Sequence, residues 1–115
     1  MHLFPFFPQT ASLLRGLYKS TPKLALDVLK DIKASTGAAL VLHGSSGIPH
    51  DQIQQAIKLG ITKINLATEI KDAFMKSLKS NLLNTDEIDL RIVFPPAIKE
   101  VENLIVNKLN IINYA

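Results

Sequence analysis

The sequence predicts an α/β protein built on a parallel β-sheet, and three observations lead to that prediction. Residues 38–42 are five apolar residues without polar alternation, a pattern typical of a strand buried on both faces. Residues 61–66 contain a second short apolar segment. Segments with helical periodicity alternate with these two strands, and this order implies βαβ units.

The helices are predicted from apolar stripes and from the residues at their ends. A first helix is expected over residues 24–35, after the Thr21-Pro22 entry and before Gly37. The second begins at Pro49 and runs to about residue 59, with Gly60 ending it. A third is expected over residues 68–82, where Phe74, Leu78 and Leu82 recur at a spacing of four, and a last one over residues 95–109.

Composition narrows the function classes. The length of 115 residues fits one domain at most, and the absence of cysteine excludes disulfides, thiolate metal sites and a cysteine nucleophile. The net charge is +3 and the lysines are scattered, so no nucleic-acid partner is expected. No apolar run reaches the roughly 18–20 residues of a membrane span, and no targeting segment is recognised, so we expect a cytoplasmic protein without a membrane partner.

Polar residues follow both predicted strands. His43-Gly44-Ser45-Ser46-Gly47 comes after the first strand, and Asn65 and Thr68 lie at the end of the second. In parallel sheets ligands bind outside the carboxyl ends of the strands, so any chemistry is expected at that edge.

Each of these residues has a functional and a structural interpretation. His43 can ligate a metal or transfer protons, or it can be a hydrogen-bonded histidine at a strand end. The glycine- and serine-rich turn suits a phosphate at a helix N-terminus, but it also suits a tight turn with a capping serine. Thr68 can cap its helix or donate to an anion. His2 and His50 do not have metal-ligand spacing to His43, so three zinc ligands cannot be assembled.

Taken together, these segments resemble a known family. Three stretches are similar to the class II, zinc-dependent ketose-bisphosphate aldolases, in the fructose- and tagatose-bisphosphate branch. They are Leu40 to Ile48, residues 51–61 and residues 63–69. Residues 16–24 extend the similarity upstream. The resemblance implies the C-terminal portion of a TIM (β/α)₈ barrel, namely its last two to three βα units plus a terminal helix.

The resemblance also implies an activity and a site. Enzymes of this family are lyases that reversibly cleave fructose or tagatose 1,6-bisphosphate to dihydroxyacetone phosphate and glyceraldehyde 3-phosphate, using Zn²⁺, and they form homo-oligomers. By position His43 is similar to a zinc ligand. The residues similar to the family's phosphate- and substrate-binding positions are Gly16, Gly44, Ser45, Ser46, Asn65, Leu66, Ala67 and Thr68.

The departures from the family pattern predict a chain that is inactive alone. The position before Gly16 is histidine in the family, a second zinc ligand, but here it is Arg15, whose permanent cation cannot ligate zinc. The family's catalytic aspartate and its neighbouring histidine ligand lie upstream of the matching region. A complete barrel needs about 250 residues. We therefore expect a divergent segment over residues 1–15 and a partial barrel domain over residues 16–115.

Three hypotheses follow for such a chain: an inactive aldolase remnant, a sugar-phosphate-binding module without catalysis, and a fragment that complements a separate N-terminal half. The segment of residues 1–14, in which phenylalanines alternate with prolines, fits neither helical nor strand periodicity well. An altered reading frame before Arg15 would explain this segment.

Overall fold

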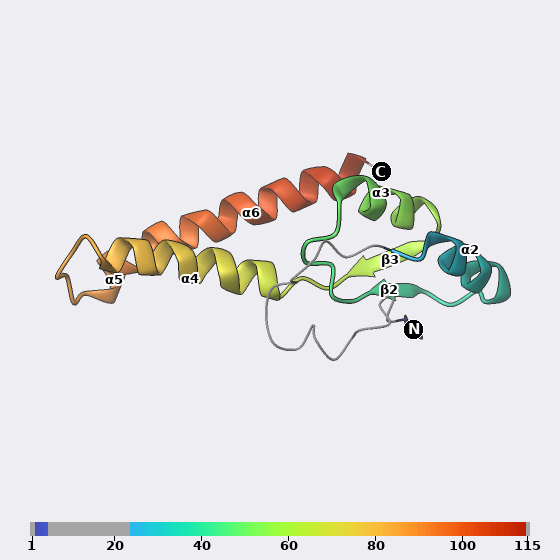
Figure 1. The fold of residues 1–115 in the computed structure, drawn as a ribbon, viewed down its shortest axis with the longest axis horizontal. Helices are drawn as coiled ribbons and strands as arrows, with labels where there is room; N and C mark the ends of the chain where they lie inside the picture. The colour runs from blue at the N-terminus through green and yellow to red at the C-terminus, as the bar shows by residue number, and fades with distance from the viewer. Residues whose placement is uncertain (1, 5–23, 115) are drawn as a thin grey trace.

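The computed structural model describes residues 2–4 and 24–114, which form an α/β structure with a parallel sheet (Figure 1). In chain order the elements are β1 (His2–Phe4), α2 (Leu26–Ser35), β2 (Leu40–Leu42), α3 (His50–Lys58), β3 (Ile61–Ile64), α4 (Thr68–Leu82), α5 (Leu90–Val93) and α6 (Pro95–Tyr114). The predicted third helix has the observed bounds, and the predicted strands are longer than the observed ones. Arg15 and Gly16 lie outside the described residues.

The sheet has three strands in the order β1-β2-β3, and both pairings are parallel. The parallel βαβ prediction is therefore confirmed. Residues 1–14 fit strand periodicity poorly, yet residues 2–4 form a short strand that pairs with residues 40–42 of β2. A three-residue strand is too short for period-two alternation to be visible, so this pairing depends on the tertiary neighbour rather than on local pattern.

A β-bulge in β3 explains an irregular apolar spacing. Leu40 pairs with Ile61 and Val41 pairs with Lys63, so Thr62 is an extra residue on β3. Its Oγ1 donates a hydrogen bond to the Leu40 carbonyl at 3.1 Å. Residues three apart point to opposite faces of a regular strand, but the bulge lets Ile61 and Ile64 both pack on the same core.

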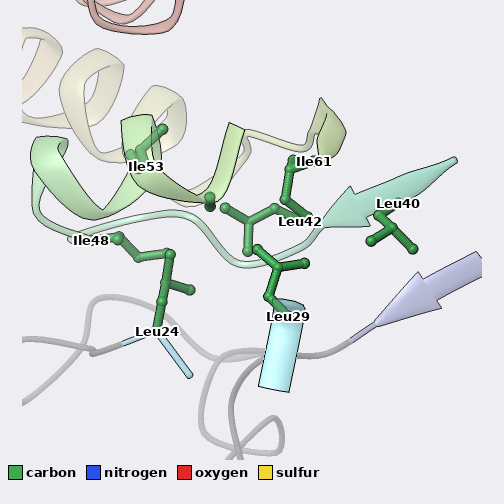
Figure 2. Close-up of a cluster of buried hydrophobic side chains, with 8 residues drawn as sticks. Leu24, Leu29, Leu40, Leu42, Ile48, Ile53 and Ile61 are labelled. Carbon is green, nitrogen blue, oxygen red and sulfur yellow. The ribbon is translucent and has the colours of Figure 1, made fainter. Parts of the chain in front are cut away.

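The core lies where α2, β2, α3 and β3 meet (Figure 2). All three residues of β2 are fully buried, as predicted for a strand covered on both faces. The side chains that form the buried cluster are Leu24, Leu29, Leu40, Leu42, Ile48, Ile53, Ala56 and Ile61. The Gln52 side chain also accepts a hydrogen bond from the Leu24 N–H at 2.8 Å, which fixes the entry to α2 against α3.

Helices α4, α5 and α6 form a hairpin that extends away from the sheet (Figure 1). The molecule is correspondingly long, with a largest dimension of 57 Å. Phe74 and Phe94 pack edge to face with ring centroids 5.7 Å apart, and the Asn81 amide donates to the Val93 carbonyl at 2.9 Å. No residue of α4 is buried, and Leu82, expected on its inner stripe, is 48% exposed.

The hairpin leaves much apolar surface open. Large hydrophobic side chains that are exposed on it are Met75, Leu82, Leu83, Ile88, Leu90, Ile92, Ile98, Val106 and Leu109. Within residues 24–114, no helix is long and apolar enough to cross a membrane.

The tip of the hairpin is held by Asp89, which caps α5. Its carboxylate accepts a hydrogen bond from the Arg91 backbone N–H at 2.9 Å and pairs with the Arg91 guanidinium at 2.7 Å. The side-chain hydrogen bond from Arg91, followed by the backbone one, lowers the pKa of Asp89. A lowered pKa in the folded state stabilises the cap at neutral pH, and this contribution is lost as the pH falls through the folded-state pKa.

The core predicts a large difference between two neighbouring residues of α2. Leu29 is 1% exposed in the buried cluster, whereas Val28 is 52% exposed. We expect Leu29→Ala to lower the free energy of unfolding by about 2–5 kcal/mol, because it removes buried methyl groups and leaves a cavity. Val28→Ala is the matched control and should change it by about 0.5 kcal/mol or less. Urea unfolding measures both, and equal small effects would contradict the described core.

Candidate functional site

The two polar turns lie side by side at the carboxyl edge of the sheet. One turn follows β2 and the other follows β3, and these two strands are paired. The Asn65 N–H donates to the Leu42 carbonyl at 3.0 Å, which continues the pairing one residue past the end of β3 to the last residue of β2. The juxtaposition expected from the sequence is therefore present.

Asn65 also holds His43. The Asn65 side-chain amide lies 3.0 Å from the imidazole Nδ1, and the imidazole Nε2 is buried without a hydrogen-bond partner among the described residues. With the amide donating to Nδ1, a neutral ring carries its hydrogen on Nε2. His43 is therefore hydrogen-bonded at Nδ1, as the structural interpretation expects, and it has an unpaired Nε2, which the metal-ligand interpretation requires.

The turn after β2 has a defined backbone conformation. The Ile48 N–H donates to the Ser45 carbonyl at 3.3 Å, and this closes a β-turn with Gly47 in its third position at φ 75°. Ser45 is fully buried, and its Oγ donates to the Asn65 carbonyl at 3.0 Å. The hydroxyl hydrogen of Ser45 is therefore used to join the two turns. Gly44 also has a positive φ, of 61°.

Neither helix that begins at this edge is capped by a side chain. The N-cap residue of α3 is Pro49, and that of α4 is Ala67, which is exposed. The capping interpretations of the serine turn and of Thr68 are therefore wrong. Thr68 is instead the first residue of α4, and within the described residues neither its hydroxyl nor that of Ser46 makes a hydrogen bond. Both hydroxyls keep their donor capacity.

Unpaired backbone donors accompany those hydroxyls at the start of α4. The first backbone hydrogen bond of this helix runs from the Lys71 N–H to the Ala67 carbonyl at 3.1 Å. The N–H groups of residues 68–70 therefore precede the first intrahelical bond, and the helix dipole adds about half a positive charge at this end. Leu66, which joins β3 to this helix, is half-buried.

Sequence reasoning missed a second link between the turns. Glu69 Oε1 accepts a hydrogen bond from the Gly47 N–H at 2.9 Å, and Oε2 pairs with Lys108 Nζ of α6 at 2.7 Å. The two side chains are only 16% and 10% exposed. A usable signal was present, since Lys108 interrupts an apolar stripe that includes Leu104 and Ile111. A lysine on an inward face needs a partner.

The polar residues at this edge fit only in part the zinc ion that the family resemblance implies. The orphaned Nε2 of His43 fits a metal ligand if the Asn65 amide rotates to offer Oδ1 to a protonated Nδ1, since a ligating histidine donates its other N–H to an oxygen. However, no group of three His, Cys, Asp or Glu side chains suitable for a metal occurs in residues 2–4 and 24–114. The described residues therefore do not supply the three protein ligands that a catalytic zinc takes.

Comparison with known proteins places this edge in context. The family model described as fructose-bisphosphate aldolase class-II matches residues 14–115. The structure of the YdjI aldolase from Escherichia coli K12 superposes with a TM-score of 0.69 and 35% identity, over 79% of this chain and 34% of that one. The fructose-bisphosphate aldolase of Campylobacter jejuni gives a TM-score of 0.65 at 19% identity, over 86% of this chain and 37% of that one, and shares the fold.

The chain thus spans about a third of the length of these two structures. The family match covers most of the sequence, including both polar turns, α4 and α6. The chain belongs to the class II fructose-bisphosphate aldolase family.

Proposed function

We propose that this chain binds the phosphate group of dihydroxyacetone phosphate, or of a ketose bisphosphate, between its two polar turns. The observation that carries the proposal is the hydrogen bonding of Asn65, which holds both turns together at the edge where parallel α/β sheets bind ligands. In this proposal the chain forms the last two to three βα units and the terminal helix of a (β/α)₈ barrel.

The chemistry of the two turns suits a phosphate. The hydroxyls of Ser46 and Thr68 are uncommitted donors, and the first N–H groups of α4 carry the positive end of the helix dipole. Gly44 and Gly47 allow the backbone to approach a ligand without a side chain in between. In this assignment Ser45 and Asn65 position the turns, and Gly16 adds a further contact by its resemblance to the family position.

The proposed reaction is that of the family, the reversible aldol cleavage of fructose or tagatose 1,6-bisphosphate. His43 would be one ligand of the zinc ion, which supplies Lewis-acid polarisation of the ketone carbonyl when bound. Because the described residues offer one ligand, and Arg15 stands where the family has another, we propose that the 115-residue chain alone does not catalyse the reaction.

A second function is favoured by the open apolar surface of the hairpin. The exposed side chains of α4 and α6, together with coverage of about a third of the neighbouring structures, suit a fragment that completes a separately supplied N-terminal half. Such a half would cover apolar helix faces and pair the outer edge of β3.

Ser46 provides the first test of phosphate binding. We expect Ser46→Ala to weaken the affinity for dihydroxyacetone phosphate by about tenfold or more, because a hydrogen bond to a charged group contributes about 1.5–3 kcal/mol. Ser80→Ala, an exposed serine of α4, is the control and should leave the affinity unchanged. Isothermal titration calorimetry measures both, and no saturable binding by the unsubstituted chain at millimolar ligand would refute the proposal.

Zinc content and aldol cleavage test the proposed inactivity. A monodisperse sample of the 115-residue chain should hold no stoichiometric zinc after dialysis against micromolar Zn²⁺ and should not cleave either bisphosphate, because one ligand cannot retain the ion. Elemental analysis and a coupled assay for glyceraldehyde 3-phosphate measure the two quantities. Turnover with bound zinc would show that other residues complete the site.

Arg15→His tests the complementation alternative. When the chain is mixed with the N-terminal half of a class II aldolase, this substitution should restore more activity than any other single change, because it replaces a cation by an imidazole ligand. Gly37→His, a change at a position away from both turns, is the control. If Arg15→His restores no activity, either the positional match or the complementation hypothesis is wrong.

A further inference from the structure

The Glu69 carboxylate contacts both Lys108 and the backbone of the turn after β2. A carboxylate beside a turn that binds phosphate would repel the ligand. Here one carboxylate oxygen faces Lys108 Nζ at 2.7 Å, while the other accepts the Gly47 N–H at 2.9 Å. The cation neutralises the carboxylate, and the carboxylate remains free to hold the backbone of the turn.

We propose that Glu69 and Lys108 are positioning residues that set the conformation of the turn Ser45–Ile48 and thereby its affinity for phosphate. The inference rests on the proposed function, and it assigns to the C-terminal helix a role in the ligand site. Lys108 belongs to α6, Glu69 to the first turn of α4 and Gly47 to the turn after β2, so the contact joins three segments distant in sequence.

The location of Gly47 makes this contact decisive for the turn. Gly47 is exposed and has a positive φ, so the surrounding core does not fix its peptide. The closing bond of the β-turn, from the Ile48 N–H to the Ser45 carbonyl, is 3.3 Å long, whereas the bond from Gly47 to Glu69 is 2.9 Å. The charged acceptor therefore gives the stronger constraint on the peptide between Ser46 and Gly47.

The surrounding structure holds the acceptor itself in place. Lys108 is buried, and α6 is joined to α3 near this point by the Gln54 side-chain amide, which donates to the Ile111 carbonyl at 3.2 Å. An ion pair that is nearly excluded from water has few alternative geometries, because leaving one partner uncompensated is costly. This pair differs from that of Lys99 and Glu102 on the same helix, which is 68% and 57% exposed.

Two substitutions at Glu69 separate the hydrogen bond from the charge. Glu69→Gln and Glu69→Met both remove the negative charge and leave Lys108 unpaired, but only glutamine keeps an oxygen that can accept the Gly47 N–H. We expect Glu69→Met to weaken dihydroxyacetone phosphate binding by about tenfold more than Glu69→Gln. Glu102→Gln, in the exposed pair, should have no effect.

A second readout does not depend on any ligand. Amide hydrogen exchange at Gly47 should become at least about tenfold faster in Glu69→Met and in Lys108→Met than in the unsubstituted chain, while the amide of Val41 in β2 remains protected. Lys108→Met provides this test if Glu69→Met does not fold. Glu69→Gln should retain most of the protection.

The outcomes distinguish the inference from the proposed function. If the unsubstituted chain binds no dihydroxyacetone phosphate but the Gly47 exchange responds as described, the proposed function fails and the positioning of the turn is supported. If Glu69→Gln and Glu69→Met weaken binding equally, or if Gly47 exchange is unchanged in Glu69→Met and Lys108→Met, the positioning role is overturned.

Discussion

The parallel pairing of β2 with β3 is the constraint on which the rest of the structure depends. It extends one residue past β3 through the hydrogen bond from the Asn65 N–H to the carbonyl of Leu42, the last residue of β2, so the turns that follow the two strands start side by side. From that point the Asn65 side chain reaches His43, and the Asn65 carbonyl accepts from Ser45. Asn65, in the turn after β3, thus fixes the separation of the two turns, because its partners His43 and Ser45 in the other turn lie 22 and 20 positions away in sequence.

Buried and exposed apolar side chains are distributed unequally over the molecule. The buried apolar cluster is formed by side chains of α2, α3, β2 and β3 and of the segments next to them, and it holds these elements together below the two turns. The hairpin of α4 and α6 has no comparable cover, and its apolar side chains are exposed along most of its length. The carboxyl edge of the sheet lies between these two regions, where the hairpin begins. The ion pair between Lys108 and Glu69 therefore links the exposed hairpin to the turns at this edge.

Much of this arrangement could be predicted from the sequence, and the failures have physical causes. Apolar runs such as residues 38–42 and long periodic segments such as residues 68–82 identify their elements, because their pattern matches the period of the structure they form. The bulge at Thr62 could not be predicted, because it depends on pairing with β2. The capping role of Thr68 was wrong, because Ala67 is the N-cap residue and Thr68 is already the first residue of the helix. Glu69 and Lys108 are 39 residues apart, and only tertiary folding brings them together.

The central claim is that the two turns form one phosphate site. It is tested most directly by recording backbone amide chemical shifts of the ¹⁵N-labelled chain during a titration with dihydroxyacetone phosphate. The account predicts saturable shifts at residues 44–47 and 65–69 that follow a single binding curve. Shifts confined to one turn, two different binding curves, or saturable shifts centred on another part of the chain would contradict it.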